Sequence, residues 1–161
     1  MKLILSIFAS LFLFFQSSDL ESLRNSYSKA NLSTQNTKDF IQLADKKTSS
    51  DPVILAYKSA AKIMEAKVTT EKNKRKTFVK TGATSLESII KNNPANTELR
   101  LIRMSVQENI PKIVGYSKNI KEDKAFLLSN YSKQNAALKN YIKKFALQSK
   151  SMTAAEKNVL K

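Results

Sequence analysis

Cysteine, histidine and tryptophan are absent from this chain of 161 residues, and glycine occurs only twice. Without cysteine or histidine, thiol nucleophiles, histidine-based triads and zinc sites built from these residues are excluded. The two glycines are isolated, which excludes a glycine-rich phosphate-binding loop. A sheet-rich fold needs many tight turns, which use glycine and proline, so the scarcity of both argues against sheets.

The residues that are abundant favour helix, and no segment alternates between apolar and polar side chains as a strand would. We therefore predict an all-α domain of about 7–8 helices that are arranged in antiparallel pairs. Capping patterns mark several helix starts: Ser18–Glu21, Asp51-Pro52, Asn119–Glu122 and Thr153–Glu156. The other main segments expected to be helical are Phe40 to Lys47, Val53 to Lys67, Glu71 to Asn92, Asn96 to Glu108 and Lys133 to Ser149. A polar break is expected at residues 31–37.

Residues 1–18 have the pattern of an export signal. A lysine is followed by an almost entirely apolar stretch from Leu3 to Phe15 and then by a short polar stretch. The apolar stretch is too short to span a bilayer, which takes roughly 20 residues. We predict a signal peptide over 1–18, a single helical domain over 19–161, and an exported protein, periplasmic or secreted. No later segment is expected to cross a membrane.

Two stretches of the chain are similar to known helical proteins. The pair of long helices that ends in Asn-Asn-Pro-Ala-Asn resembles the punctuation of tetratricopeptide repeats, and Gly82 and Leu86 fit the small and bulky positions of such a repeat. A glycine inside a helix is unfavourable, and a close helix contact at Gly82 would offset that cost. The closer resemblance is to small exported, degenerate tetratricopeptide-like proteins of Bacteroidetes-type bacteria, which have no assigned activity. It covers about residues 51–131 and is carried by Glu98-Leu-Arg-Leu-Ile-Arg103, Gln107, Asn109, Pro111 and Gly115-Tyr116.

The acidic residues do not form a catalytic pair. Asp19 and Glu21 are placed to cap the first helix, and Glu122 and Asp123 lie where a helix dipole favours negative charge. Adjacent residues on a helix point about 100° apart, which is unsuitable for a two-carboxylate site. We therefore expect no enzyme, no cofactor and no metal site.

Positive charge dominates the chain, with a formal net charge of +15. The lysines are spread along the whole sequence, which favours a solvated surface over a dedicated anion-binding face. The densest run, residues 72–76, is interpreted as an exposed helix start or loop, and no nucleic acid is expected as a partner. The basic amphipathic segment 133–149 suits either an anionic membrane surface or, in the favoured interpretation, packing of its apolar face onto the preceding helix.

The candidate binding site contains two of the four arginines. Arg100, Arg103 and Gln107 form a stripe at positions i, i+3 and i+7 of one predicted helix, and Tyr116 completes the candidate set. The stripe lies between apolar positions, so partial burial is expected, and arginine suits that setting because its planar guanidinium binds carboxylates in pairs. The favoured interpretation is an internal ion-pair network with Glu98, Glu108, Glu122 or Asp123. The alternative is a groove that accepts an anionic group or a peptide carboxylate.

Together these patterns favour a non-catalytic module that binds an unknown protein or peptide. The alternative is a lysine-rich binder of an anionic membrane surface or a polyanion. Salt dependence separates the two, because polyanion binding falls steeply with salt and a packed peptide interface does not.

Overall fold

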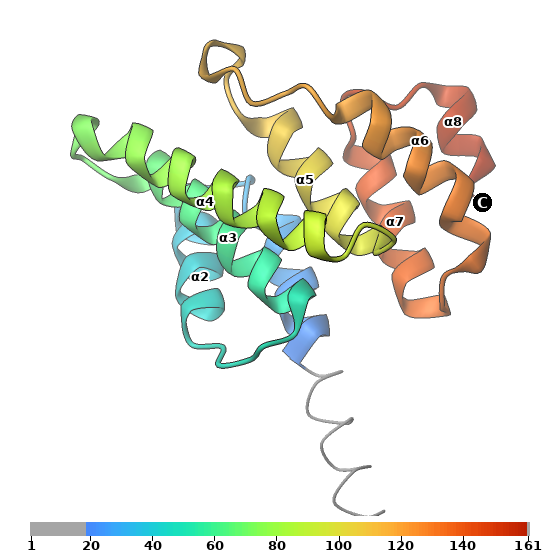
Figure 1. The fold of residues 1–161 in the computed structure, drawn as a ribbon, viewed down its shortest axis with the longest axis horizontal. Helices are drawn as coiled ribbons and strands as arrows, with labels where there is room; N and C mark the ends of the chain where they lie inside the picture. Colours follow the sequence, from blue (N-terminus) through green and yellow to red (C-terminus); the bar gives the residue numbers. More distant parts are fainter. Residues whose placement is uncertain (1–18, 161) are drawn as a thin grey trace, which may run out of the picture.

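The computed structural model describes residues 19–160, and within this range the chain forms helices and turns but no strand. The predicted all-α class is confirmed for these residues. The predicted export signal, with Ser18 of the first capping pattern, lies outside them. The helices run over residues 19–29, Thr34–Asp45 (α2), Pro52–Val68 (α3), Lys72–Asn92 (α4), Thr97–Asn109 (α5), Ile120–Asn130 (α6), Ala136–Gln148 (α7) and Ala154–Val159 (α8), with 3₁₀ turns at Lys112–Val114 and Tyr131–Lys133 (Figure 1).

Two of the predicted helix starts are confirmed by their capping bonds. The Asp51 carboxylate accepts hydrogen bonds from the backbone N–H groups of Val53 at 2.8 Å and Ile54 at 3.2 Å, ahead of α3. Thr153 and Glu156 form a reciprocal capping box at the start of α8. These side chains satisfy N–H groups that have no partner within the helix, so each start is fixed by its local sequence.

Two other predicted boundaries are wrong. The expected polar break at residues 31–37 is shorter, because Ser33 accepts a hydrogen bond from Asn36 N at 3.0 Å and starts α2 within it. The segment expected to be helical from Lys133 first forms a 3₁₀ turn, and α7 begins after Asn135, whose side chain accepts from Leu138 N at 2.9 Å. In both cases a short polar side chain caps the helix that follows it.

The long helices α3 and α4 lie side by side (Figure 1). Gly82 of α4 lies at their contact. A Cβ atom at Gly82 would come within 2.6 Å of both the Ser59 carbonyl oxygen and Ile63 Cγ1. A glycine inside a helix costs about 1 kcal/mol relative to alanine, and here the close approach of the two helices offsets that cost. The close helix contact predicted at this glycine is confirmed.

Aromatic side chains fill the core between the first helix, α2 and α3. Tyr27, Phe40 and Tyr57 are buried, and their ring centroids lie 5.0 to 6.4 Å apart in tilted and edge-to-face arrangements. Such pairs add roughly 0.5–1.5 kcal/mol each to the stability gained from burial. The chain has no disulfide, so this core and its continuation along α5 hold the domain together.

The central helix of the fold is α5, which contacts α3, α4, α6 and α7 (Figure 1). Ten of its 13 residues are buried, including Glu98, Arg103 and Gln107, so these polar side chains must find their partners inside the protein. Leu138, Tyr141, Ile142 and Ala146 of α7 are buried, whereas Leu147 is exposed, so most of the apolar face of this helix packs within the domain, against α5, α8 and the 3₁₀ turn that precedes it. Within residues 19–160, no helix has the length and apolar character needed to cross a bilayer.

Candidate functional site

Arg103 lies at the centre of a buried group of charges between α4, α5 and α6. Its Nε and Nη2 atoms donate to the two carboxylate oxygens of Asp123 at 2.7 and 2.6 Å, and its Nη1 donates to Glu87 at 2.7 Å. Arg103 and Asp123 are 3% and 0% exposed. Burial alone would lower the pKa of Arg103, but the hydrogen bonds and negative charges of Asp123 and Glu87 raise it. The guanidinium therefore stays charged and tightly held.

Arg100 joins the same group from one helical turn earlier. It donates to the carboxylates of Glu122 and, at 3.2 Å, of Asp123, and its guanidinium lies 5.1 Å from the centre of the Phe126 ring. Hydrogen bonds from Asn119 and Arg100 lower the pKa of Glu122. The Nε atom of Arg100 is buried without a hydrogen-bond partner. Among the residues described, the acidic partners of Arg100 are Glu122 and Asp123, which are two of the four partners proposed from the sequence.

Gln107 and Tyr116 anchor the loop that follows α5. The side-chain oxygen of Gln107 accepts from Asn119 N at 3.1 Å, and its amide donates to Asn119 Oδ1 at 3.3 Å. Tyr116 donates its hydroxyl to Glu87 at 2.7 Å. Burial and the neighbouring Glu87 raise the pKa of Tyr116 well above its usual value. Asn119 was expected to cap α6, but its side chain makes no capping bond because it is engaged by Gln107 and Glu122.

The four sequence-predicted residues are thus brought together, and we call them, with Glu87, Glu122 and Asp123, the arginine network. Each of the four side chains has an internal partner. Arg103 also touches the same Glu87 carboxylate as Tyr116, so the buried charges and the loop at residues 110–116 form one connected structure. Among the four, Tyr116 lines an open groove.

A second buried ion pair has no counterpart in the sequence predictions. Arg24 of the first helix donates through Nε to Glu98 of α5 at 2.7 Å, and the Tyr57 hydroxyl donates to the same carboxylate at 2.9 Å. Glu98 therefore forms its ion pair with Arg24 and not with Arg100 or Arg103. The one signal in the sequence was that Arg24 is one of only four arginines, and the 74 residues between the partners hide the pairing from any local pattern.

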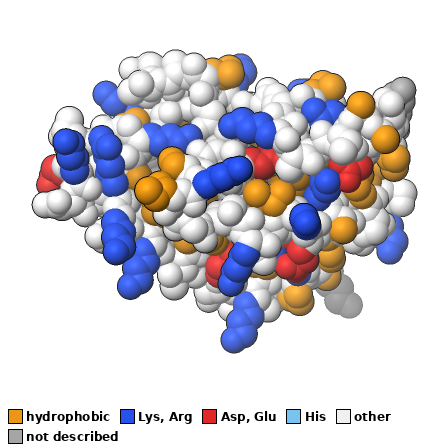
Figure 2. Space-filling view, turned by 90° about the horizontal axis from the view of Figure 1, so that it is seen from above, with side chains coloured by type: hydrophobic (Ala, Val, Ile, Leu, Met, Phe, Trp, Pro, Cys, Tyr) orange, Lys and Arg blue, Asp and Glu red, His pale blue; other side chains and the backbone are white. Residues whose placement is uncertain are grey.

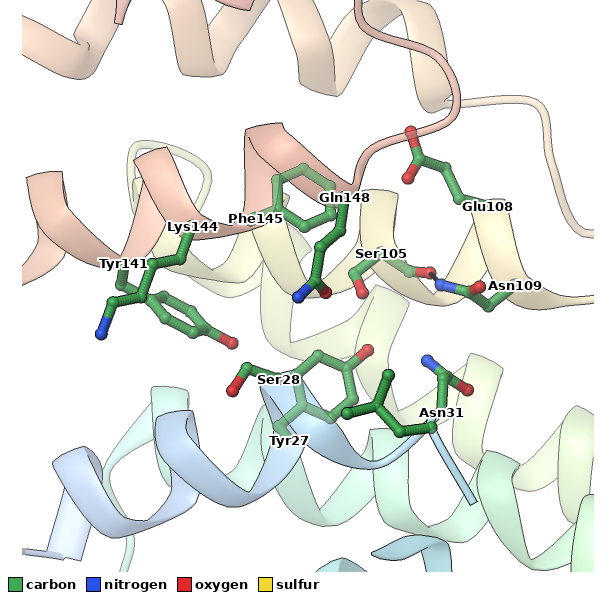
Figure 3. Close-up of a pocket in the computed structure, with 11 residues that line it drawn as sticks. Tyr27, Ser28, Asn31, Ser105, Glu108, Asn109, Tyr141, Lys144, Phe145 and Gln148 are labelled. Carbon is green, nitrogen blue, oxygen red and sulfur yellow. Dashed lines mark hydrogen bonds between the residues drawn. The ribbon is translucent and has the colours of Figure 1, made fainter. Parts of the chain in front are cut away.

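A small pocket with mixed polar and apolar walls lies between the first helix, α5 and α7 (Figure 3). Its volume of about 100 Å³ is enough for several water molecules. Burial raises the pKa of Tyr27 in its wall to about 12, so this hydroxyl stays protonated at neutral pH. Glu108 is already engaged by Ser149 at 2.6 Å and by Ser151. The pocket can hold hydrogen-bonding water.

A larger groove opens between the end of α3, the start of α4 and the loop at residues 110–116, and we call it the cationic groove. Its volume is about 960 Å³, and no aspartate or glutamate is among the described residues that line it. Figure 2 shows Lys and Arg side chains crowded at the left end of the molecule, with a hydrophobic patch beside them. The cationic lining residues are Lys67, Lys72, Arg75, Lys76 and Lys80, and the apolar ones include Ile63, Ala66, Val79, Ala83, Ile110, Pro111, Ile113 and Val114.

The loop wall of this groove is built and held by specific backbone features. Pro111 precedes a 3₁₀ turn over Lys112–Val114, and Gly115 ends it in the left-handed conformation with φ of 73°, which a side chain would strain. The hydroxyl of Tyr116 then fixes the loop to α4 through Glu87. This geometry leaves Ile113 96% exposed at the mouth of the groove.

The basic run at residues 72–76 forms the exposed first turns of α4, as the favoured interpretation of the sequence predicted. Cations there oppose the helix dipole, and the Glu71 side chain makes no capping bond. Lys74 pairs with Glu71 at 2.8 Å, but both side chains are more than half exposed, so the pair stabilises the helix little. Folding alone gives no reason for this concentration of positive charge.

Comparisons of the chain with protein-family models, with curated proteins and with solved structures find no match. Among the described residues, no group of three or more acidic side chains is placed to hold a metal ion.

Proposed function

We propose that this chain is a non-catalytic, exported interaction module that binds a segment of another protein in the cationic groove. What supports this is one observation: an open groove of about 960 Å³ combines an apolar base, formed by buried Ile63 and partly buried Val79 and Ala83, with positive charge along its walls. Grooves with an apolar base and polar edges are a common way of binding peptide segments. The helix pairing is proposed to be a degenerate tetratricopeptide-like arrangement, in which adjacent helices present such surfaces.

The absence of catalysis remains part of the proposal. The adjacent carboxylates of Glu122 and Asp123 are held by Arg100 and Arg103, which leaves no free acid–base pair there. A binding role for the arginine stripe itself also remains a proposal, in which Tyr116 would contribute from the groove side. Engagement with internal partners favours positioning of the groove wall over direct contact with a ligand.

A test that assumes nothing about the partner's chemistry is selection from a random peptide library against the purified domain. The expected result is a set of peptides whose binding is lost in the double variant Ile113→Ser/Val114→Ser, because these apolar side chains line the groove mouth. The matched control is Leu147→Ser/Val159→Ser, which alters exposed apolar residues elsewhere. Peptides that bind both variants equally, or no selected peptides at all, would contradict the proposal.

The second candidate is a binder of anionic membrane surfaces. The observation in its favour is that Ile113 projects from a loop next to exposed Lys112, and an apolar tip beside cations suits the boundary of an anionic bilayer. Co-sedimentation with phosphatidylglycerol vesicles, at low and raised salt, tests it. Binding that depends on Ile113 and falls steeply with salt would favour this candidate over the peptide groove.

A further inference from the structure

We infer that the occupant of the cationic groove is an acidic amphipathic protein segment, with carboxylates facing the lysines of α4 and apolar side chains against the groove's base. This inference rests on the proposed function and adds the partner's chemistry to it. It can fail while the proposed function stands, since a groove can bind peptides of another composition. Three features of the groove support it: its charge, its apolar base and its shape.

The lysines of α4 are spaced to pair with carboxylates of a partner. Lys72, Lys76 and Lys80 are four residues apart on α4, so their positions rise by about 6 Å per step along one side of the helix. Carboxylates at every fourth position of a partner helix, or at alternate positions of an extended segment, recur at about the same interval. With no acidic residue in the described lining of the groove, the carboxylates must come from the partner.

Lys67 supports the same conclusion from the α3 side. Its amino group donates to the side-chain oxygen of Asn31, which carries no charge. Burial, and then the nearby positive charge of Lys150, lower the pKa of Lys67. Lys67 is nevertheless exposed to solvent, so its amino group is accessible, and a carboxylate in the groove would supply the missing negative charge.

The apolar base and mouth of the groove favour a protein segment over a simple polyanion as its occupant. Ile63 is 3% exposed and Val79 and Ala83 are partly buried, so the base of the groove is apolar. Ile113 stands 96% exposed at its mouth. Removing this apolar surface from water stabilises a complex, a gain that a sugar or phosphate polymer would not make.

Shape and net charge argue against the other occupants. A second copy of this chain brings a formal charge of +15 to an already positive surface, so self-association here is repulsive. A bilayer is flat on this scale and reaches the loop tip at Ile113, but it cannot fill a concave groove that extends to Ile63. A convex, negatively charged segment satisfies both constraints.

The test uses calorimetric titration of the domain with a designed peptide of about 14 residues, long enough for four helical turns. Leucines form one face of the peptide and glutamates occupy the rest. Two peptides serve as controls: a scrambled one of the same composition, and one with lysine in place of each glutamate. Phosphatidylglycerol vesicles provide the membrane arm. We expect the acidic amphipathic peptide to bind at least about tenfold more tightly than either control, because each control lacks one half of the complementarity.

Variants then locate the site. Lys76→Glu/Lys80→Glu should weaken binding of the acidic peptide by at least about tenfold, whereas Lys133→Glu/Lys143→Glu, which changes net charge equally at exposed positions away from the groove, should change it by less than about threefold. Ile113→Ser should also weaken binding. Circular dichroism of each variant verifies that it is folded.

Several outcomes would overturn the inference. Equal binding of the acidic peptide and its scrambled form would show that no apolar face is recognised. Equal losses in both charge-reversed pairs would reduce the effect to net charge. Vesicle binding without peptide binding would assign the groove to a membrane. Library-selected peptides that occupy the groove but carry no excess of acidic residues would remove the acidic partner and leave the proposed function intact.

Discussion

The arginine network and the cationic groove use positive charge in opposite ways. In the network, Arg103 is 3% exposed, and its guanidinium meets Asp123 through two hydrogen bonds and Glu87 through a third. Around the groove, Lys76 and Lys80 lie exposed on α4, and no acidic residue of the described chain lines the space they face. Removing a charge from water is costly unless it is paired, so folding dictates the first arrangement. Folding does not require the exposed lysines of the groove, so the groove is the better place to look for a partner.

The two regions are also physically connected. Glu87 accepts one hydrogen bond from Arg103 and another from the hydroxyl of Tyr116, which holds the loop wall of the groove. The network therefore positions a surface that it does not itself form. Arginine suits the interior and lysine the surface, because a planar guanidinium binds a carboxylate with two parallel bonds while a lysine amino group prefers hydration.

The largest effect is expected for Arg103→Ala. It leaves the carboxylate of Asp123, which is 0% exposed, with only Arg100 at 3.2 Å, and should lower the free energy of unfolding by roughly 3–5 kcal/mol. Urea unfolding followed by circular dichroism measures this. Arg103→Lys should recover only part of the loss, because lysine cannot form both bonds to Asp123.

Arg100→Ala should be milder, at roughly 1–2 kcal/mol, because Asp123 keeps Arg103 and Glu122 is 57% exposed. The control is Arg75→Ala at the groove, where an exposed side chain is removed. If the three alanine variants unfold at the same urea concentration, the distinction between a structural network and a free surface is wrong.

The next effect is a loss of stability at high pH. Burial raises the pKa of Tyr27 to about 12, and it also raises the pKa values of Tyr57 and Tyr141. A raised folded-state pKa means that the native state holds its proton longer, so the stabilisation is complete below the unfolded value of about 10 and is lost as pH rises towards 12. Tyr27 alone accounts for about 2–3 kcal/mol over this window.

Thermal melting between pH 9 and 12, with tyrosinate absorbance recorded in parallel, measures this loss (the pH limits are approximate and follow from the unfolded and folded pKa values). Tyr27→Phe should melt lower at neutral pH if its hydroxyl is needed, but should lose less stability per pH unit above 10. Ionisation of all tyrosines near pH 10 without unfolding would show that these hydroxyls are accessible to water.

The sequence predicted the fold where the information is local. Asp51-Pro52 and the capping box at Thr153 identified helix starts, and Gly82 identified the close contact of α3 and α4. The sequence did not predict the hydrogen bonds between Asn119 and a partner on another helix. Asn119 follows a capping pattern, but in the fold it is held by Gln107 of α5, so the local rule was overridden.

The candidate site was predicted in the same uneven way. Arg100 and Arg103 stood out because arginine is rare in this chain, and two of their four proposed partners are the observed ones. The cationic groove could not be predicted, because its walls come from α3, α4 and a loop that lie close together only after folding. The basic run at residues 72–76 is evident in the sequence, but the apolar base of the groove beside it is not.

A smaller effect is expected for Tyr116→Phe, which tests the connection between the two regions. The variant removes one hydrogen bond to Glu87, which keeps Arg103, so the loss of stability should be roughly 0.5–1.5 kcal/mol. Hydrogen exchange should rise locally at residues 110–116, whereas Ile113→Ser, in the same loop but without such a bond, should leave exchange there unchanged. Equal exchange in both variants would mean that Tyr116 does not fix the loop.

The smallest effect on stability is expected for Lys76→Glu/Lys80→Glu in the groove. Both side chains are exposed, so the free energy of unfolding should change by less than about 0.5 kcal/mol. Urea unfolding beside Lys133→Glu/Lys143→Glu, which makes the same charge change elsewhere, isolates the local contribution. A loss above about 1 kcal/mol in the groove pair alone would show that these lysines have a structural role. Unchanged stability together with lost peptide binding is the combination that distinguishes a charge kept for a partner from one kept for the fold.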